Sequence, residues 1–436
     1  MKKLAIVAFL FMISNLFVSC VDKFAIPSDV NSNGNNDFVV GDTTYLQLNP
    51  VWDSSYGLFK PVEIAIAQDG RIFIADSGNH SIHVFDQNGN SPAGFDLLKN
   101  LMDEDSTMLS PVDVDVDNKM NVFFIDGSNR VFVWNHYWNT VGINRVSTRG
   151  MFVNISSGID TVEHVGTDVW YSLLNSSDWE LVSTVFDDDT IMIDSLLRPH
   201  LFYAGSDLDV YPYQTDSSRY TGLTAPADDE NMIFVTDDYG GEQSPPQHRI
   251  VQINFQPSIL VELSTGEIVW AFTGKFGPFV EGYGTGAGTV NQPTSLDVDY
   301  QGNLYYTQAG DYFPVHMLVP NFSGDFAAYT SGFQPEADDI MNPSLYSDAV
   351  DVAVDNDKNI YVVDQNNADV SVFDSKGRFF KMAGYESSID TTSIMGKPVA
   401  VAVDDRGVVY VCDMDHGSVY RFKLSNSLDE DILPED

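Results

Sequence analysis

Two kinds of residue are scarce in this chain of 436 residues: cysteine, with two, and the basic residues, with 22 lysines and arginines together. With two cysteines, the chain cannot be a small protein held together by several disulfides, nor can it bind zinc through several thiolates. Against 63 aspartates and glutamates, the bases leave a formal net charge of −41. Because proteins bind nucleic acids largely through lysine and arginine, this balance argues against a nucleic-acid partner.

Long apolar runs are absent as well, except at the beginning. After Met1 and two lysines, residues 4–17 are almost wholly apolar, which is too short for a transmembrane helix but typical of a secretory signal. The run leads into Ser19 and Cys20, and a small residue directly before a cysteine resembles the lipobox of bacterial lipoproteins. The resemblance implies a signal peptide over 1–19 and a lipid on Cys20. An ordinary cleaved signal with a chance cysteine is the alternative.

This resemblance also implies a cellular location. We expect an exported protein of the bacterial cell envelope, at the outer membrane, whose only link to the membrane is its lipid. Residues 20–42 are predicted to be a flexible tether, because 31–37 contains only asparagine, serine, glycine and aspartate. Residues 425–436 form an acidic tail. Cys412 lies in an apolar, strand-like run and is predicted to be a buried thiol.

Between these ends a two-part pattern repeats. A segment of alternating character, which mostly begins with proline, is followed by a continuously apolar segment that mostly ends in aspartate fifteen residues after the start. The copies begin at Pro61, Pro111, Gly222, Pro293, Ala349 and Pro398. The alternating part predicts a strand with two different faces, and the apolar part predicts a strand covered on both sides.

A polar turn joins the two parts, so each copy is predicted to be a hairpin, extended by a third strand and a variable fourth one. Such a sheet cannot bury both faces alone, but copies stacked around an axis can, which is the architecture of a β-propeller. The copies that begin at Pro61 and Ala349 closely resemble the NHL repeat. We therefore predict an all-β fold, an NHL-type propeller over residues 43–424.

Six copies predict six blades. The interval from 111 to 222 is about twice as long as the others, so it holds either an insertion, at about 135–221, or a seventh blade without the signature. We favour six blades with the insertion and keep seven as the alternative. Residues 44–48 are predicted to form the outer strand of the last blade and so to close the ring.

The first strand of each blade of a propeller lines the axial channel. The third positions of the copies bring carboxylates from Glu63, Asp113 and Asp351 towards one axis, with Thr224, Ser295 and Ala400 in the other copies. The fifth positions add Asp115, Asp297 and a displaced Asp228. Glu63, Asp113 and Asp351 are candidate ligands for Ca²⁺, which prefers several oxygen donors. The alternative is a solvated channel whose side chains bond to nearby backbone.

The repeats also resemble those of two enzymes, the NHL-like peptidylglycine lyase and the streptogramin lyase. Both enzymes use histidines on the inner strands or on the central face of the propeller. None of the eight histidines of this chain falls in an inner-strand segment. A zinc site and a histidine general base are therefore not expected there. The aspartates that end the second strands are expected to cap the turns that follow them.

Aromatic residues gather in the insertion, which contains Trp138, Trp170 and Trp179. With Asp237 and Asp238 nearby, they suit a glycan or a peptide with basic residues. The alternative is that they form the insertion's own small core. We predict a protein-, peptide- or glycan-binding module rather than an enzyme. A calcium-dependent propeller hydrolase or lactonase and a structural envelope component remain alternatives.

Overall fold

The chain divides into two units, residues 1–42 and 43–436, and the described residues belong to the second. The computed structural model describes residues 44–102, 107–135, 218–226, 232–238, 248–263, 268–281, 286–310, 313–321, 328–335, 337–385 and 392–425, and short strands between 152 and 202. This part is all-β, as predicted. Among the described residues, no helix combines the length and the apolar character needed to cross a membrane.

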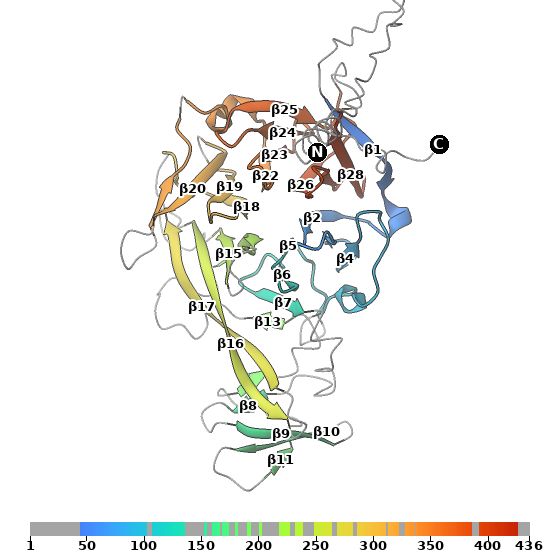
Figure 1. Cartoon of the computed structure of the whole chain (residues 1–436), viewed down its shortest axis with the longest axis vertical. Helices are drawn as coiled ribbons and strands as arrows, with labels where there is room; N and C mark the ends of the chain where they lie inside the picture. Colours follow the sequence, from blue (N-terminus) through green and yellow to red (C-terminus); the bar gives the residue numbers. More distant parts are fainter. Residues whose placement is uncertain are drawn as a thin grey trace, which may run out of the picture. The chain divides into compact units, whose positions relative to one another are not determined.

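Small antiparallel sheets, which we call blades, make up the fold (Figure 1). Blade 1 contains β2 (Pro61–Ile66), β3 (Ile72–Asp76) and β4 (Ser81–Phe85). Blade 2 contains β5 (Asp113–Val116), β6 (Asn121–Ile125), β7 (Val131–Asn135) and β13 (His200–Phe202). Blade 3 contains β14 (Tyr220–Thr224), β15 (Met232–Asp237), β16 (Arg249–Leu263) and β17 (Ile268–Glu281).

The chain continues in the same way to its C-terminal blade. Blade 4 contains β18 (Pro293–Val298), β19 (Leu304–Gln308), β20 (Val315–Asn321) and β21 (Ala328–Ser331). Blade 5 contains β22 (Ala349–Val354), β23 (Ile360–Asp364), β24 (Asp369–Phe373) and β25 (Phe379–Ala383). Blade 6 contains β26 (Pro398–Val403), β27 (Val409–Asp413), β28 (Ser418–Leu424) and β1 (Tyr45–Trp52).

The innermost strands surround a common axis (Figure 1). In the described part of the chain, β2, β5, β14, β18, β22 and β26 lie side by side in this order, and β26 lies beside β2. This arrangement is a β-propeller. Since β5 lies directly beside β14, no further sheet separates blade 2 from blade 3.

The core consists of apolar clusters, one at each junction between neighbouring blades. Between blades 1 and 2, for example, Phe73 packs in the same cluster as Val122 and Phe124. Every residue of β3, β6, β19, β23 and β27 is buried. The continuously apolar second strands therefore lie covered on both faces, as their sequence predicts. Cys412, in β27, is buried as predicted.

The N-terminal segment closes the ring by adding β1 to β28, with Tyr45 opposite Leu424. Trp52 at the end of β1 is fully buried, and the guanidinium of Arg421 lies 4.9 Å from the centre of its ring. The closing strand is thus held both by backbone pairing and by a cation–π contact.

The long interval between the second and third copies is an insertion inside blade 2. Because β13 pairs with β7 as the fourth strand of blade 2, the insertion lies between Asn135 and His200, not over 135–221 as predicted. It contains β8 (Phe152–Asn154), β9 (Ile159–Val165), β10 (Asp168–Leu173), β11 (Trp179–Leu181) and β12 (Thr190–Met192).

The insertion is joined to an unusually long hairpin of blade 3. Strands β16 and β17 have 15 and 14 residues and pair with each other over nearly their full length. Strand β9 pairs in parallel with the far end of β16, Thr161 opposite Glu262, and β10 and β11 follow it. Residues 272–274 lie within β17. We call β9–β11 with the far part of β16–β17 the arm (Figure 1).

Candidate functional site

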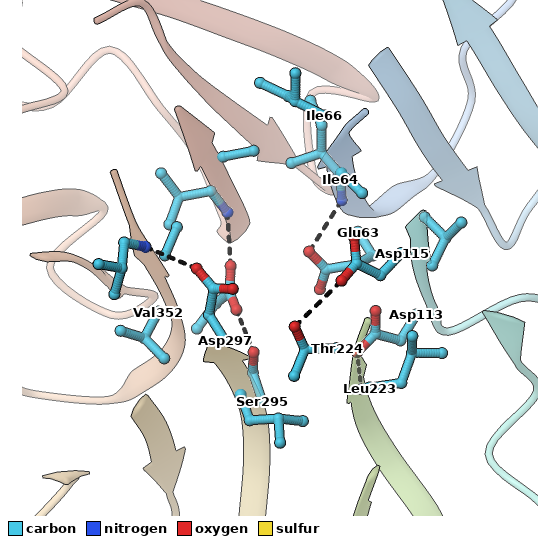
Figure 2. A pocket seen from close by; sticks show the side chains of 18 of the residues that line it. Glu63, Ile64, Ile66, Asp113, Asp115, Leu223, Thr224, Ser295, Asp297 and Val352 are labelled. Carbon is cyan, nitrogen blue, oxygen red and sulfur yellow. Dashed lines mark hydrogen bonds between the residues drawn. The ribbon is translucent and has the colours of Figure 1, made fainter. Parts of the chain in front are cut away.

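Carboxylates from four inner strands meet in the central channel (Figure 2). Glu63 comes from β2, Asp113 and Asp115 from β5, Asp297 from β18 and Asp351 from β22. They line a cavity of about 170 Å³. Since side chains two residues apart in a strand share a face, the third and fifth positions of the copies in blades 1, 2, 4 and 5 line this cavity, as predicted.

Blade 3 departs from the predicted register. Tyr220, not Gly222, pairs with the aspartate that ends the second strand, as Pro61 pairs with Asp76 in blade 1. The first hairpin of blade 3 is two residues longer than that of blade 1. Counted from Tyr220, Gly222 therefore takes the third position and Thr224 the fifth. A Cβ on Gly222 would lie 2.9 Å from the Cα of Ser295, so only glycine lets β14 approach β18 this closely. Asp228 lies outside the described residues.

Two of these carboxylates join blade 2 to blade 3. The N–H of Leu223 donates to Asp113 Oδ2 at 2.7 Å, and the N–H of Ala225 donates to Asp115 Oδ2 at 2.7 Å. The hydroxyl of Thr224 adds a bond of 3.2 Å to the same oxygen of Asp115. A negatively charged acceptor makes such bonds stronger than those between neutral groups.

The next junctions are built in the same way. The N–H of Val354 in blade 5 donates to Asp297 Oδ2 of blade 4 at 2.7 Å. The N–H of Val401 in blade 6 donates to Asp351 Oδ2 of blade 5 at 2.6 Å. The hydroxyl of Ser295 donates to the other oxygen of Asp351. These carboxylates therefore act first as ties between neighbouring inner strands.

Glu63 is different, because its hydrogen bond comes from the N–H of Ile64 in its own strand, at 2.9 Å. Burial raises the pKa of Glu63 well above its ordinary value, and repulsion from Asp351 and Asp113 adds to the rise. Burial also raises the pKa of Asp113 well above its ordinary value. Among the channel carboxylates of the described residues, Glu63 alone makes no hydrogen bond to a neighbouring blade.

The remaining channel carboxylates titrate far above the usual range of aspartate. Burial raises the pKa of Asp115 and of Asp351 to about 6. Burial, with repulsion from Asp115, raises the pKa of Asp297 to about 7. Lysine, arginine and histidine do not occur among the residues that line the cavity. The lining of this cavity therefore offers the carboxylates no basic side chain as a counter-charge.

The predicted calcium ligands Glu63, Asp113 and Asp351 do lie at one cavity. A metal site needs oxygens that converge on one point, whereas Asp113 and Asp351 each give one oxygen to a neighbouring backbone N–H. Within the described ranges, no group of three or more histidine, cysteine or acidic side chains has a geometry that could hold a metal ion. As they stand, these residues do not fit calcium.

The channel widens at the end where the turns between the first and second strands lie. A second cavity of about 440 Å³ shares Asp115, Thr224 and Asp297 with the first. Its rim includes Tyr300 and Asp405. The channel is thus open at this end of the blades.

The aspartates that end the second strands cap the following turns, as predicted, and also hold the chain that enters the blade. Asp76 accepts the N–H groups of Gly78 and Asn79 in its turn, and those of Phe59 and Lys60 before β2. Asp364 and Asp413 repeat this pattern. These side chains therefore have a structural role in holding each blade together.

The structure corrects the expectation that Asp237 is available to a partner. Asp237 is 0% exposed, its carboxylate lies 2.9 Å from the guanidinium of the buried Arg249, and it accepts bonds from Ser218 and the N–H of Arg219. Asp238 is half-buried, with Oδ1 2.7 Å from Nδ1 of His248. Only Asp238 of this pair reaches the surface.

Two of the three predicted tryptophan anchors lie in the arm. Trp170 of β10 is opposite Leu181, and Trp179 of β11 is opposite Ser172, so the register places both tryptophans on the same face of this sheet. Trp138 lies outside the described residues. Sequence reasoning missed the hairpin to which this sheet is attached, although the apolar, β-branched segments around Ser264-Thr265-Gly266-Glu267 are a hairpin signal.

Comparisons with known proteins agree with the fold. The model of the NHL repeat matches residues 60–85, which are the strands of blade 1. Blade 1 matches an NHL repeat. Together with the ring of sheets, this finding supports an NHL-type propeller. No curated protein matches the sequence.

Several solved propellers are similar in structure at low identity. Virginiamycin B lyase from Staphylococcus aureus is 11% identical, with 88% of this chain and 99% of that one covered and a TM-score of 0.43. A gluconolactonase from Xanthomonas campestris is 11% identical, with 88% and 98% covered and a TM-score of 0.43. The WD40 propeller domain of Doa1 is 11% identical, with 90% and 100% covered and a TM-score of 0.43.

Proposed function

We propose that this NHL-type propeller is a binding module of the bacterial cell envelope, lipid-anchored through Cys20, and that it contacts a protein, peptide or glycan through the arm. The observation that carries the proposal is the arm itself, a sheet added beyond blades 2 and 3 with Trp170 and Trp179 on one face. Elaborations on a rigid scaffold are the usual place of recognition. The propeller supplies the scaffold, since its channel carboxylates bond to neighbouring blades.

The strands of the insertion, β8–β12, can be removed without cutting a blade. Deletion of residues 152–192 leaves β13 in place as the fourth strand of blade 2, and we expect it to preserve cooperative unfolding while abolishing cross-linking to partners in envelope preparations. The matched point variants are Trp170→Ser and Trp179→Ser, each expected to weaken capture by tenfold or more, because truncation of a buried aromatic anchor costs about 2 kcal/mol. Unchanged capture by a folded deletion variant would refute a role for β9–β11, the part of the arm that carries Trp170 and Trp179.

The lipid anchor has its own test. Growth with a labelled fatty acid is expected to mark the full chain, and Cys20→Ala is expected to lose the label completely. Cys412→Ala is the matched control and keeps the label, because Cys412 is buried in β27. Equal labelling of wild type and Cys20→Ala would show that the lipobox resemblance is fortuitous.

A calcium-dependent hydrolase or lactonase is the second candidate, favoured by the mutual repulsion of Glu63, Asp113 and Asp351 in one cavity. Under our proposal, calorimetry detects no binding of Ca²⁺ tighter than about 1 mM, the weak end of calcium sites. Tight binding that disappears in Asp113→Ala would favour the hydrolase. A purely structural envelope component would instead keep one fixed partner and bind no isolated peptide or glycan.

A further inference from the structure

Strand β25, the outermost strand of blade 5, exposes three large apolar side chains in four consecutive residues. Phe379 is 44% exposed, Phe380 49% and Met382 37%. The other exposed large apolar side chains in the described part of the chain lie singly or in pairs elsewhere. Single exposed apolar residues are normal at protein surfaces, whereas a contiguous group indicates a surface that contacts something.

The fold supports this surface from behind but leaves its outer side open. The ring of Phe379 packs edge-on against buried Phe373 at 5.8 Å, and its N–H donates to Asp339 at 2.9 Å. In the sheet order of blade 5, β25 is last, and within the described residues no strand pairs with its other edge. Phe380 and Met382 share a face of the strand, since they are two residues apart.

Charge around β25 is balanced, unlike the charge of the chain as a whole. Exposed Lys376 and Arg378 precede the strand, and Lys381 lies within it. Asp374 forms an exposed ion pair with Arg378, and Asp339 is exposed close by. In a chain of formal charge −41, this surface escapes the repulsion that acidic surfaces experience near phosphate groups. Mixed charges beside aromatic side chains match zwitterionic phospholipid headgroups.

The start of the described chain lies next to this surface. Strand β1 is side by side with β25, and the Tyr45 hydroxyl is hydrogen-bonded to that of Tyr361 in blade 5. The first described residue, Thr44, is therefore a neighbour of blade 5. The roughly two dozen residues from Cys20 to Thr44 would span about 27 Å as a flexible tether. A lipid on Cys20 thus keeps a bilayer within reach of β25.

We propose that β25 is the surface with which the protein lies against a bilayer of zwitterionic phospholipid, with Phe379, Phe380 and Met382 in the interfacial layer. The proposal rests on the lipid anchor of the proposed function. Burial of these side chains adds a contact that the acyl chain alone does not provide and sets the orientation of the propeller. The bilayer is the occupant, and a protein or a second copy of this chain is an outcome of the test.

A thiol probe tests the proposal on the full lipidated chain. Cys412 is buried, so Phe380→Cys introduces a thiol that a polarity-sensitive fluorophore can label selectively. The labelled protein is reconstituted into phosphatidylethanolamine–phosphatidylcholine vesicles that contain a nitroxide-bearing lipid. Phe59→Cys is the matched control, because Phe59 is 67% exposed and lies just before β2 of blade 1, which blade 6 separates from blade 5. We expect severalfold stronger quenching at position 380 than at position 59.

Equal quenching at the two positions, or none at position 380, would overturn the proposal. So would a probe at position 380 that is shielded without vesicles in a protein that sediments as a dimer, since β25 would then join two copies. Fatty-acid labelling of Cys20 is measured on the same samples. If Cys20 carries the fatty-acid label but quenching is not selective for position 380, only the bilayer surface is refuted. If quenching is selective but Cys20 carries no fatty-acid label, only the lipid anchor is refuted.

Discussion

Asp413→Ala is expected to lower the free energy of unfolding by about 4 kcal/mol. Asp413 is fully buried and accepts N–H groups from Gly396 and Lys397 before β26 and from Asp415 and His416 after β27. Alanine removes all four of these part-buried hydrogen bonds at once, and each such bond contributes about 1 kcal/mol. Urea denaturation followed by circular dichroism measures the change.

Asp413→Asn is the graded companion of this variant. It keeps one acceptor oxygen, and we expect it to recover about half of the loss. Asp86→Ala is the matched control, because Asp86 also caps a turn, with N–H groups of Asn88 and Asn90, but its bonds are exposed. A loss at Asp413→Ala no larger than that at Asp86→Ala would show that the buried aspartates do not hold the blades together.

Asp297→Asn is expected to raise the free energy of unfolding at pH 8 by about 2 kcal/mol. The pKa of Asp297 is raised to about 7 in the folded chain, against an ordinary value near 3.8, because the side chain is buried and lies near Asp115. A tenfold difference in proton affinity between the folded and unfolded chains corresponds to about 1.4 kcal/mol, and screening by solvent reduces the full effect to about half. Asparagine keeps an oxygen for the N–H of Val354 but carries no charge.

The sign of the pH dependence follows from the raised value. Because the folded chain binds the proton more tightly than the unfolded chain, the carboxyl group of Asp297 favours folding below pH 4, and this contribution is lost as pH rises to about 7. Wild type should therefore lose stability over this range, and Asp297→Asn should lose less. Asp374→Asn, in an exposed ion pair, is the control and should change the slope little. A destabilised Asp297→Asn at pH 8 would contradict the explanation.

The fold was readable from the sequence because its two local patterns are strong. In blade 1, the alternating segment from Pro61 and the apolar run Ile72-Phe73-Ile74 become the strands that their periods predict, an inner strand and a covered one. Blade 3 was misread because its longer hairpin moves Thr224 by two positions, and no local residue marks the shift. The insertion was predicted, but the long β16–β17 hairpin to which it is joined was missed, because this hairpin occurs once and no repeated pattern points to it.

The candidate site was only partly predictable. Spacing alone places Glu63, Asp113 and Asp351 around one axis, since inner strands repeat and face the centre. Whether an oxygen of Asp351 bonds to the N–H of Val401 depends on the separation of two blades, which no single segment determines. Burial of Asp237 likewise depends on Arg249, which lies opposite it on the neighbouring strand β16 and pairs with its carboxylate.

Closure of the ring by β1 has a consequence for the order of folding. Thr44 and Ser425 bond to each other although 381 positions separate them, so the first strand of the propeller has no partner until the last one exists. At ribosomal rates, that interval is roughly 20–80 s. Throughout it, the apolar side chains of β1 stay open to other chains. A helper that shields an extended N-terminal segment would therefore influence the yield of this protein more than one that acts on any later blade.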